Sequence, residues 1–279
     1  MRKDIFLPGV ALAGGVLGFG LRRWQLASAY VADTQLFLHK APATVALMAV
    51  LAVSLVLLLL LNRSKGRPVD DFLPAFRCHS PVFAVVIGLG ALLLLCAGGM
   101  SLVRGLETLA LWRSQPDAVQ LALPLVMLLC GGLSIPAGLG LLVLQTDLRQ
   151  DKPLGPSALL LPCPGFAGVF WVLIIHLTHG VDPLLMGYGI LLLAAVFLSL
   201  AWYYAAAFFF DRCRPRRLVF CALAGTVFGL TALADSPALP DLLLTLGLML
   251  PILALTSVLL RNLHGPAWFG ARQQDRPRD

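Results

Sequence analysis

The chain has 279 residues, of which 59% are hydrophobic and 13% are charged, with 21 Lys and Arg against 14 Asp and Glu. A soluble domain carries about twice that fraction of charge, so the composition excludes an ordinary soluble fold and indicates a lipid-embedded chain. The net charge of +7 does not indicate nucleic-acid binding, because the basic residues stand between long apolar runs and their expected partner is an anionic membrane surface.

Eight stretches free of Asp, Glu, Lys and Arg are each long enough for one membrane-spanning helix, which needs about 17–25 apolar residues. In chain order, helices are expected near 5–21, 42–61, 80–103, 118–144, 157–178, 183–208, 218–234 and 240–260. Backbone amides in lipid must be hydrogen-bonded within the segment, which favours helices. The expected fold is an all-α polytopic membrane helix bundle, a single integral domain over residues 1–279. Pro162 and Pro164 predict a kink in the fifth helix or a late start.

The distribution of Lys and Arg predicts that both ends of the chain lie in the cytoplasm. With the amino terminus inside, the cytoplasmic segments hold sixteen basic residues and the outer segments hold five. The five are Arg22, Arg23, Lys40, Arg104 and Arg113. This asymmetry follows the positive-inside rule and requires an even number of spans. Its weak point is Arg22-Arg23, which directly follows the first span on the disfavoured side.

The first span has a second interpretation as a secretory signal peptide. Met1-Arg2-Lys3 resembles the basic start of such a peptide, and Ala27-Ser28-Ala29 resembles a cleavage site. Arg22 and Arg23 stand between the apolar run and that site and disfavour cleavage, so the helix is expected to be retained. Cleavage would leave seven helices and keep the rest of the topology.

Charged groups are scarce within the expected spans, so the bundle is predicted to be nearly free of buried charge. The most notable polar pair is His176 and His179, which are three residues apart on one face of the fifth helix and are followed by Asp182. Imidazole and carboxylate suit several divalent ions, so these three residues form a candidate metal site at the outer face. The alternative is that both histidines are hydrogen-bonded residues at the membrane interface.

The densest run of charges precedes the seventh span. It contains Arg212, Arg214, Arg216 and Arg217. The run is first a topology signal, and it is also the candidate site for anionic lipid head groups at the cytoplasmic face. At the outer end of the third helix, Glu107 is expected to form a surface ion pair with Arg104.

Small residues at helical spacing occur in several spans. GxxxG steps lie at Gly14–Gly18 in the first helix and at Gly225–Gly229 in the seventh, and the segments Cys96–Ser101 and Cys130–Ser134 share a similar run of small residues. This spacing lets helix backbones approach closely, and no strand–turn–helix unit surrounds the glycines as it would in a nucleotide site.

Motifs of catalysis are missing from the sequence. It contains no P-loop, no HExxH zinc-protease motif and no Gly-x-Ser-x-Gly motif, and its six cysteines form no CxxC pair. The chain is therefore expected to be non-enzymatic. No cofactor, substrate or protein partner is indicated.

Several short segments resemble a group of bacterial multi-pass membrane proteins without assigned function. They are Leu21–Leu26, Pro42-Ala43-Thr44, His176–Pro183, Tyr188, Tyr203-Tyr204, Pro215-Arg216-Arg217 and Leu233-Ala234-Asp235. The resemblance spans most of the chain. It implies a bacterial inner, or cytoplasmic, membrane and no particular activity.

Three classes of function remain open at the level of sequence. A non-enzymatic membrane component ranks first, because no catalytic constellation is present. A small permease or transport-complex subunit is indicated by the Gly- and Pro-rich helices, and a quinone-side membrane anchor of a redox complex rests on analogy with other eight-helix anchors. A polar cavity that reaches the middle of the membrane would favour transport, and a continuously packed bundle would disfavour it.

Overall fold

The computed structural model describes residues 3–31, 36–38, 40–63, 72–116, 119–150, 155–179, 185–210 and 212–264. Within these ranges eight helices are long and apolar enough to cross a membrane, which confirms the all-α multi-pass fold. The long helices are α1 (Lys3–Ser28), α2 (Pro42–Leu61), α4 (Pro81–Ser114), α5 (Ala122–Gln150), α7 (Cys163–His179), α8 (Leu185–Phe209), α9 (Pro215–Ala232) and α10 (Leu239–His264). The short elements are β1 (Tyr30–Val31), β2 (Leu36–Phe37), α3 (Phe72–Phe76), α6 (Pro156–Leu160) and the 3-10 turn η1 (Leu233–Asp235).

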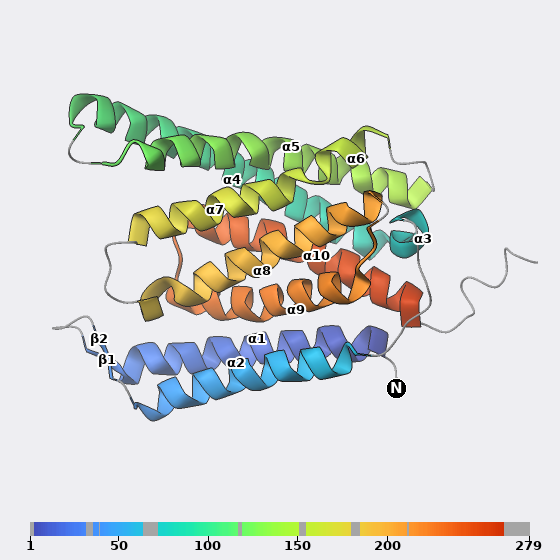
Figure 1. The fold of residues 1–279 in the computed structure, drawn as a ribbon, viewed down its shortest axis with the longest axis horizontal. Helices are drawn as coiled ribbons and strands as arrows, with labels where there is room; N and C mark the ends of the chain where they lie inside the picture. Colours follow the sequence, from blue (N-terminus) through green and yellow to red (C-terminus); the bar gives the residue numbers. More distant parts are fainter. Residues whose placement is uncertain are drawn as a thin grey trace, which may run out of the picture.

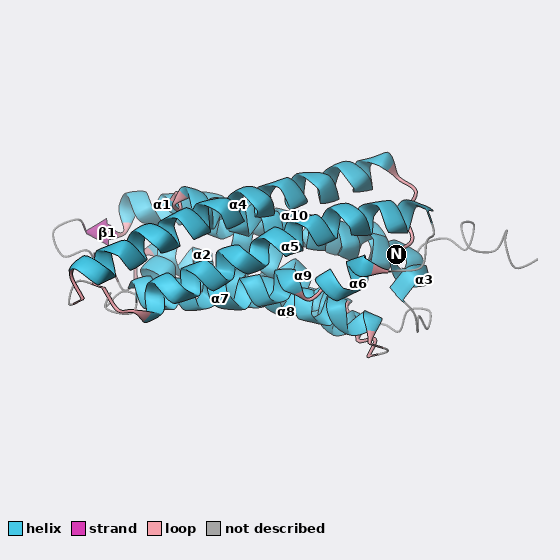
Figure 2. Cartoon of the chain, turned by 90° about the horizontal axis from the view of Figure 1, so that it is seen from above, coloured by secondary structure: helices cyan, strands magenta, loops and turns pink. Residues whose placement is uncertain are grey.

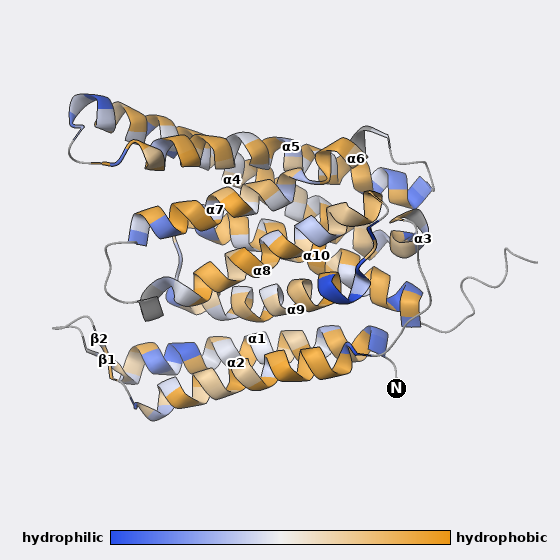
Figure 3. Ribbon diagram, in the orientation of Figure 1, coloured by the Kyte–Doolittle hydropathy of each residue, from blue (hydrophilic) through white to orange (hydrophobic). Residues whose placement is uncertain are grey.

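The long helices run side by side along one direction, and the bundle therefore has two ends (Figures 1 and 2). The Arg216 end is the one at which α1 begins and α10 ends, and there the Asn62 amide donates to the carbonyl oxygen of Arg216 at 2.7 Å. The Asp235 end is the opposite one, at which α7 and η1 end. Hydrophilic residues gather at these two ends, and apolar residues dominate between them (Figure 3).

Six of the spans form a closed ring. Each packs against the next in the order α4, α5, α7, α8, α9 and α10, and α10 packs back against α4. The hairpin of α1 and α2 lies outside this ring, with both helices against α9 and with α1 also against α10 (Figure 1). The ring therefore has an interior of its own, and α1 and α2 add a layer on one side of it.

Glycines allow the closest helix contacts, as the GxxxG steps and the small-residue segments predicted. A Cβ atom would lie 2.6 Å from Ser54 Oγ if added at Gly14, 2.9 Å from Leu198 Cδ2 if added at Gly225, and 2.8 Å from the Gly98 carbonyl oxygen if added at Gly131. These positions leave no room for a side chain without a shift of the neighbouring helix.

Helix ends depart from the expected ones at several places: α5 runs Ala122–Gln150 where 118–144 was expected, and α10 ends at His264 where 260 was expected. The first helix continues to Ser28 instead of ending near residue 21, and α4 continues to Ser114 instead of ending near residue 103. The fifth span is interrupted between α6 and α7, at Pro162, and Pro164 follows in the first turn of α7. Proline has no amide hydrogen to donate, so this break is the late start that the two prolines predicted.

Candidate functional site

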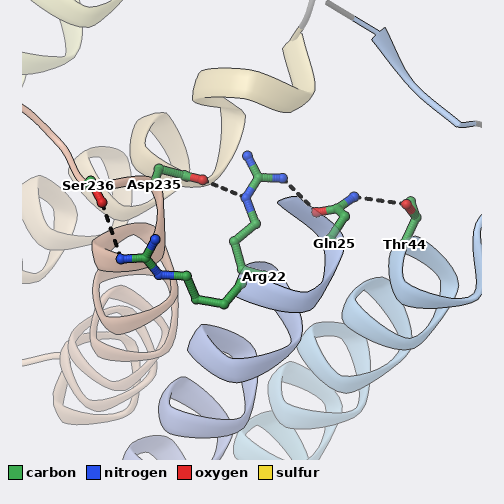
Figure 4. Close-up of polar contacts among 6 residues, drawn as sticks. Arg22, Gln25, Thr44, Asp235 and Ser236 are labelled. Carbon is green, nitrogen blue, oxygen red and sulfur yellow. Dashed lines mark hydrogen bonds and ion pairs between the residues drawn. The ribbon is translucent and has the colours of Figure 1, made fainter. Parts of the chain in front are cut away.

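Arg22 lies in the interior of the protein, with 2% of its side chain exposed. Its Nε donates a hydrogen bond to Oδ1 of Asp235 at 2.6 Å, and its Nη1 donates to Oε1 of Gln25 at 2.7 Å. Gln25 Nε2 then donates to Oγ1 of Thr44 at 2.9 Å. This polar network, formed by Thr44, Gln25, Arg22 and Asp235, joins α2, α1 and the end of the α9–η1 segment (Figure 4).

The prediction of a bundle nearly free of buried charge is therefore wrong at this place. A guanidinium is tolerated in an apolar interior only where a partner and further acceptors satisfy it, and Asp235 and Gln25 do so here. The ring of Phe37 covers the charge, with its centroid 5.1 Å from Arg22 Cζ. Because Arg22 is neutralised inside the protein, the first helix can continue past it to Ser28. The same neutralisation explains why Arg22 can lie on the side that the positive-inside rule, applied to the count of Lys and Arg, disfavours.

The neighbouring arginine is different. Arg23 is exposed, and its Nη2 donates to Oγ of Ser236 at 3.3 Å. Ser236 has a φ of 51°, a left-handed conformation that ends η1. Arg22 and Arg23 therefore hold two successive residues of the same turn, one inside the protein and one at its surface.

A cavity of about 360 Å³ lies inside the six-helix ring at the Asp235 end. Every helix of the ring contributes to its wall, as in Arg104 of α4, Met127 of α5, Trp171 of α7, Tyr188 of α8, Ala232 of α9 and Asp241 of α10. Asp235 of η1 lines it as well, so the same side chain belongs to the polar network and to the cavity. The cavity is therefore central to the ring.

Some of the residues that line the cavity are exposed, and others are buried. Arg104, Thr178 and Ala238 are exposed, whereas Trp171 and Ser101 are buried. Trp171 lies about two turns before the end of α7, at 3.6 residues per turn, and has no exposed surface. The cavity thus opens at the Asp235 end, where the exposed lining residues lie.

Beyond the cavity the ring interior is filled by side chains. Trp202 of α8 is fully buried, and its Nε1 donates to the carbonyl oxygen of Leu248 on α10 at 3.1 Å. This contact connects two helices of the ring that are not neighbours in the ring order. The two helices are therefore in direct contact at Trp202.

Two carboxylates and one guanidinium give the cavity its charge. Asp241 Oδ1 accepts a hydrogen bond from Trp171 Nε1 at 2.8 Å. Asp235 Oδ1 is occupied by Arg22, while Asp235 Oδ2 is buried and accepts no hydrogen bond. The expected ion pair between Arg104 and Glu107 is not formed in the part of the chain that the structure describes. Arg104 lines the cavity instead.

The predicted metal ligands are only partly described. His179 lines the cavity, its Nδ1 lies 3.1 Å from the carbonyl oxygen of Ile175, and its ring stacks on Tyr188 with centroids 5.3 Å apart. His176 is exposed, and Asp182 lies outside the described residues. No group of three His, Cys, Asp or Glu side chains among the described residues could hold a metal ion. The metal site stays a prediction, and the contacts of His179 agree with the alternative of an interfacial, hydrogen-bonded histidine.

The predicted lipid-binding arginines lie together at the Arg216 end. Arg212, Arg214, Arg216 and Arg217 are all exposed. They stand at the start of α9, where charged side chains are available to head groups. Their binding of anionic lipid stays a prediction.

Comparison with known proteins gives no relative for this chain: no family model, no curated protein and no solved structure matches it. The resemblance to the bacterial membrane group therefore stays a prediction as well. Function has to be argued from the geometry of the site.

Neither acidic residue of the cavity was predicted from the sequence. Asp235 follows the expected seventh span, and Asp241 stands at the start of the last span, where an acidic residue is common in the first helical turn. One signal indicated an acidic partner for Arg22: it stands next to a span on the disfavoured side, where a guanidinium requires a carboxylate at the same membrane depth. Nothing in the sequence selects Asp235 from the other acidic residues at that end.

Proposed function

We propose that this multi-pass membrane protein is a non-enzymatic membrane component that binds a small polar ligand in the cavity at the Asp235 end. The observation that carries the proposal is the position of Asp235, Asp241 and Arg104 around a cavity in an otherwise apolar ring of helices. Charged groups at membrane depth are costly and are typical of ligand sites and pathways. A volume of about 360 Å³ lies within the range of small-ligand sites, about 300–1,000 Å³.

The proposed orientation places the Asp235 end at the outer face of a bacterial inner membrane and the Arg216 end at its cytoplasmic face. The exposed arginines at the start of α9 support this orientation, because exposed basic residues favour the cytoplasmic side. Arg22 does not oppose it, since its charge is neutralised by Asp235. The ligand then enters from the outside, and the arginines contact anionic lipids on the other face.

A permease is the second candidate, because the cavity lies inside a closed ring and not on the lipid-facing surface. Trp202 on α8 donates a hydrogen bond to the Leu248 carbonyl on α10. Transport would require a second conformation in which α8 and α10 separate at this contact. Binding without transport requires no such change, so it is the simpler function for this geometry.

A quinone anchor has less support from the site. A quinone offers only hydrogen-bond acceptors, as do Asp235 and Asp241, whereas the reduced quinol carries two O–H donors. Neither form carries a charge that would pair with Arg104 or Asp241, which line the cavity. A small polar ligand with charged groups fits this wall better.

The proposal is tested by the reactivity of a thiol placed inside the cavity. Ser101 lines the cavity, whereas Ser134 is fully buried in the packed part of α5. Ser101→Cys and Ser134→Cys form a matched pair in a background without the native cysteines. A small, charged, membrane-impermeant thiol reagent added to intact cells is expected to modify Ser101→Cys at least about tenfold faster than Ser134→Cys. Equal, slow reaction of both would mean that the cavity is closed to the outside, and the proposal would fail.

A further inference from the structure

The charges around the cavity balance one another in a specific way. Asp235 is paired with Arg22, which lies behind it and outside the cavity wall. Asp241 and Arg104 stand on α10 and α4, which are neighbours in the ring, and no hydrogen bond or ion pair joins their side chains among the described residues. The cavity therefore presents an acidic group on α10 and a basic group on α4 that are each open to a ligand.

The acidic side of the cavity has unused capacity to accept hydrogen bonds. Asp241 lines the cavity, and its Oδ1 accepts a hydrogen bond from Trp171 Nε1, which leaves its other carboxylate oxygen for a ligand. Asp235 Oδ1 is bound to Arg22, and its Oδ2 is buried. An ammonium group at Asp241 would form charge-assisted hydrogen bonds with the carboxylate.

The basic side has unused capacity to donate. The guanidinium of Arg104 lines the exposed rim of the cavity and forms no hydrogen bond or ion pair in the described part of the chain. Glu107, on the same helix, does not engage it. A guanidinium whose N–H groups have no acceptor can bind a carboxylate or phosphate with two parallel hydrogen bonds.

Apolar and aromatic residues make up much of the remaining lining. Trp171, Tyr188, Leu191 and Leu244 are among the lining residues. An apolar substituent on the ligand would bury against them and gain about 25 cal/mol per Å² of area removed from water.

We propose that the cavity selects a zwitterion, whose ammonium group binds at Asp241, whose anionic group binds at Arg104, and whose apolar part packs on Tyr188. The inference rests on the proposed function, because it names the class of ligand for the same cavity. A simple cation would leave Arg104 unsatisfied and close to a like charge, and a simple anion would face the carboxylate of Asp241. A zwitterion offers a partner to both groups.

Two sources offer this chemistry, a free amino-acid-like solute and the head group of an ethanolamine phospholipid. Both carry an ammonium and an anionic group in one small unit. Four soluble probes separate the possibilities: leucine carries both charges, leucinamide only the positive one, N-acetylleucine only the negative one, and glycerophosphoethanolamine is the lipid head group alone. Binding is measured by calorimetry on the full-length protein in phosphatidylcholine nanodiscs.

In the wild-type protein, the affinity for leucine or for glycerophosphoethanolamine is expected to exceed that for leucinamide and N-acetylleucine by about tenfold or more, because each charged hydrogen-bonded contact is lost separately. Arg104→Gln should remove the preference for leucine over leucinamide. Asp241→Asn should remove the preference for leucine over N-acetylleucine, while its side-chain oxygen can still accept from Trp171. Arg113→Gln is the control, because Arg113 lies on the same helix and is exposed but does not line the cavity.

Each outcome decides between the claims. Binding of glycerophosphoethanolamine alone supports the zwitterion and assigns it to lipid, and binding of leucine assigns it to a free solute. If leucinamide or N-acetylleucine binds as tightly as the best zwitterion, the zwitterion inference is overturned and the ligand site itself stands. If none of the four binds, the inference is also overturned, and the reactivity of Ser101→Cys decides separately whether the cavity is open.

Discussion

Two regions with similar polar side chains meet at Asp235, and the two regions arrange these side chains differently. On the side of α1 and α2, Arg22, Gln25 and Thr44 are buried, and their hydrogen bonds form one continuous chain. On the side of the ring, Arg104 and Asp241 line a cavity and are not joined to each other. Asp235 gives Oδ1 to the first region, and its Oδ2 is buried with no donor among the described residues, while the residue itself lines the cavity of the second region.

The comparison shows two ways to keep polar groups within a membrane bundle. Where the helices pack closely, as α1 and α9 do at the glycines, no space remains for a ligand, and Arg22, Gln25 and Thr44 find their partners in the protein. Where the helices stand apart around a cavity, partners are left open and a ligand or solvent must supply them. The first arrangement holds the fold together, and the second can recognise a molecule. The predictions below test this difference through the stability of the protein.

The largest effect is expected from Arg22→Met. Removal of the guanidinium leaves Asp235 charged and without its partner beside the packed helices, which costs about 3–5 kcal/mol for a buried pair. Arg23→Met is the matched control, because Arg23 is exposed and only contacts the Ser236 hydroxyl and the Phe19 ring, so about 0–1 kcal/mol is expected. The free energy of unfolding of the detergent-solubilised protein measures both. Equal losses for the two variants would contradict a buried role for Arg22.

The next effect concerns close packing within the ring. Gly131→Ala places a Cβ atom 2.8 Å from the Gly98 carbonyl oxygen, a rigid backbone group, and is expected to cost about 1–3 kcal/mol. Gly132→Ala, at the next position, meets nothing within 4 Å and is expected to change stability by less than about 0.5 kcal/mol. The same unfolding measurement compares them. A neutral Gly131→Ala would mean that α4 and α5 do not approach as closely as described.

A smaller effect is expected at the cavity wall from Trp171→Phe. The substitution removes the Nε1 donor to Asp241 Oδ1, but Asp241 faces a cavity open to solvent, so the expected loss is about 0.5–1.5 kcal/mol. Trp24→Phe is the control, since Trp24 is 47% exposed on α1 and should be close to neutral. If Trp171→Phe lowered the free energy of unfolding as much as Arg22→Met does, Trp171 and Asp241 would belong to a closed network and would not lie at an open cavity.

The smallest effect on stability is expected from the double variant Arg216→Gln and Arg217→Gln. Both side chains are exposed, so the free energy of unfolding should stay within about 0.5 kcal/mol. Association with anionic lipid should weaken by about 1 kcal/mol for each lost arginine, measured by retention of anionic lipid on the purified protein. Arg113→Gln, at the other end, is the comparison. Unchanged lipid retention would remove the proposed lipid role of the run.

The spans could be predicted from sequence because they depend on local hydrophobicity alone, and their close contacts could be predicted because small residues recur at helical spacing. The contact of Arg22 with Asp235 could not, since 213 positions separate the two residues and only the packing of α1 on α9 and η1 brings them together. The contact of Trp171 with Asp241 likewise depends on α7 and α10 meeting across the ring. The end of α1 was placed too early for the same reason: two arginines end a span unless a partner elsewhere in the chain neutralises one of them.

The most direct measurement of the central claim is a pair of double-mutant cycles on unfolding, one between Arg22 and Asp235 and one between Trp171 and Asp241. The cycles use Arg22→Met with Asp235→Leu, and Trp171→Phe with Asp241→Ala. If one side of Asp235 is closed and the other is open, the first pair should be coupled by about 2 kcal/mol or more and the second by less than about 1 kcal/mol. Coupling of equal size in the two cycles, or stronger coupling at Trp171 and Asp241, would contradict the account.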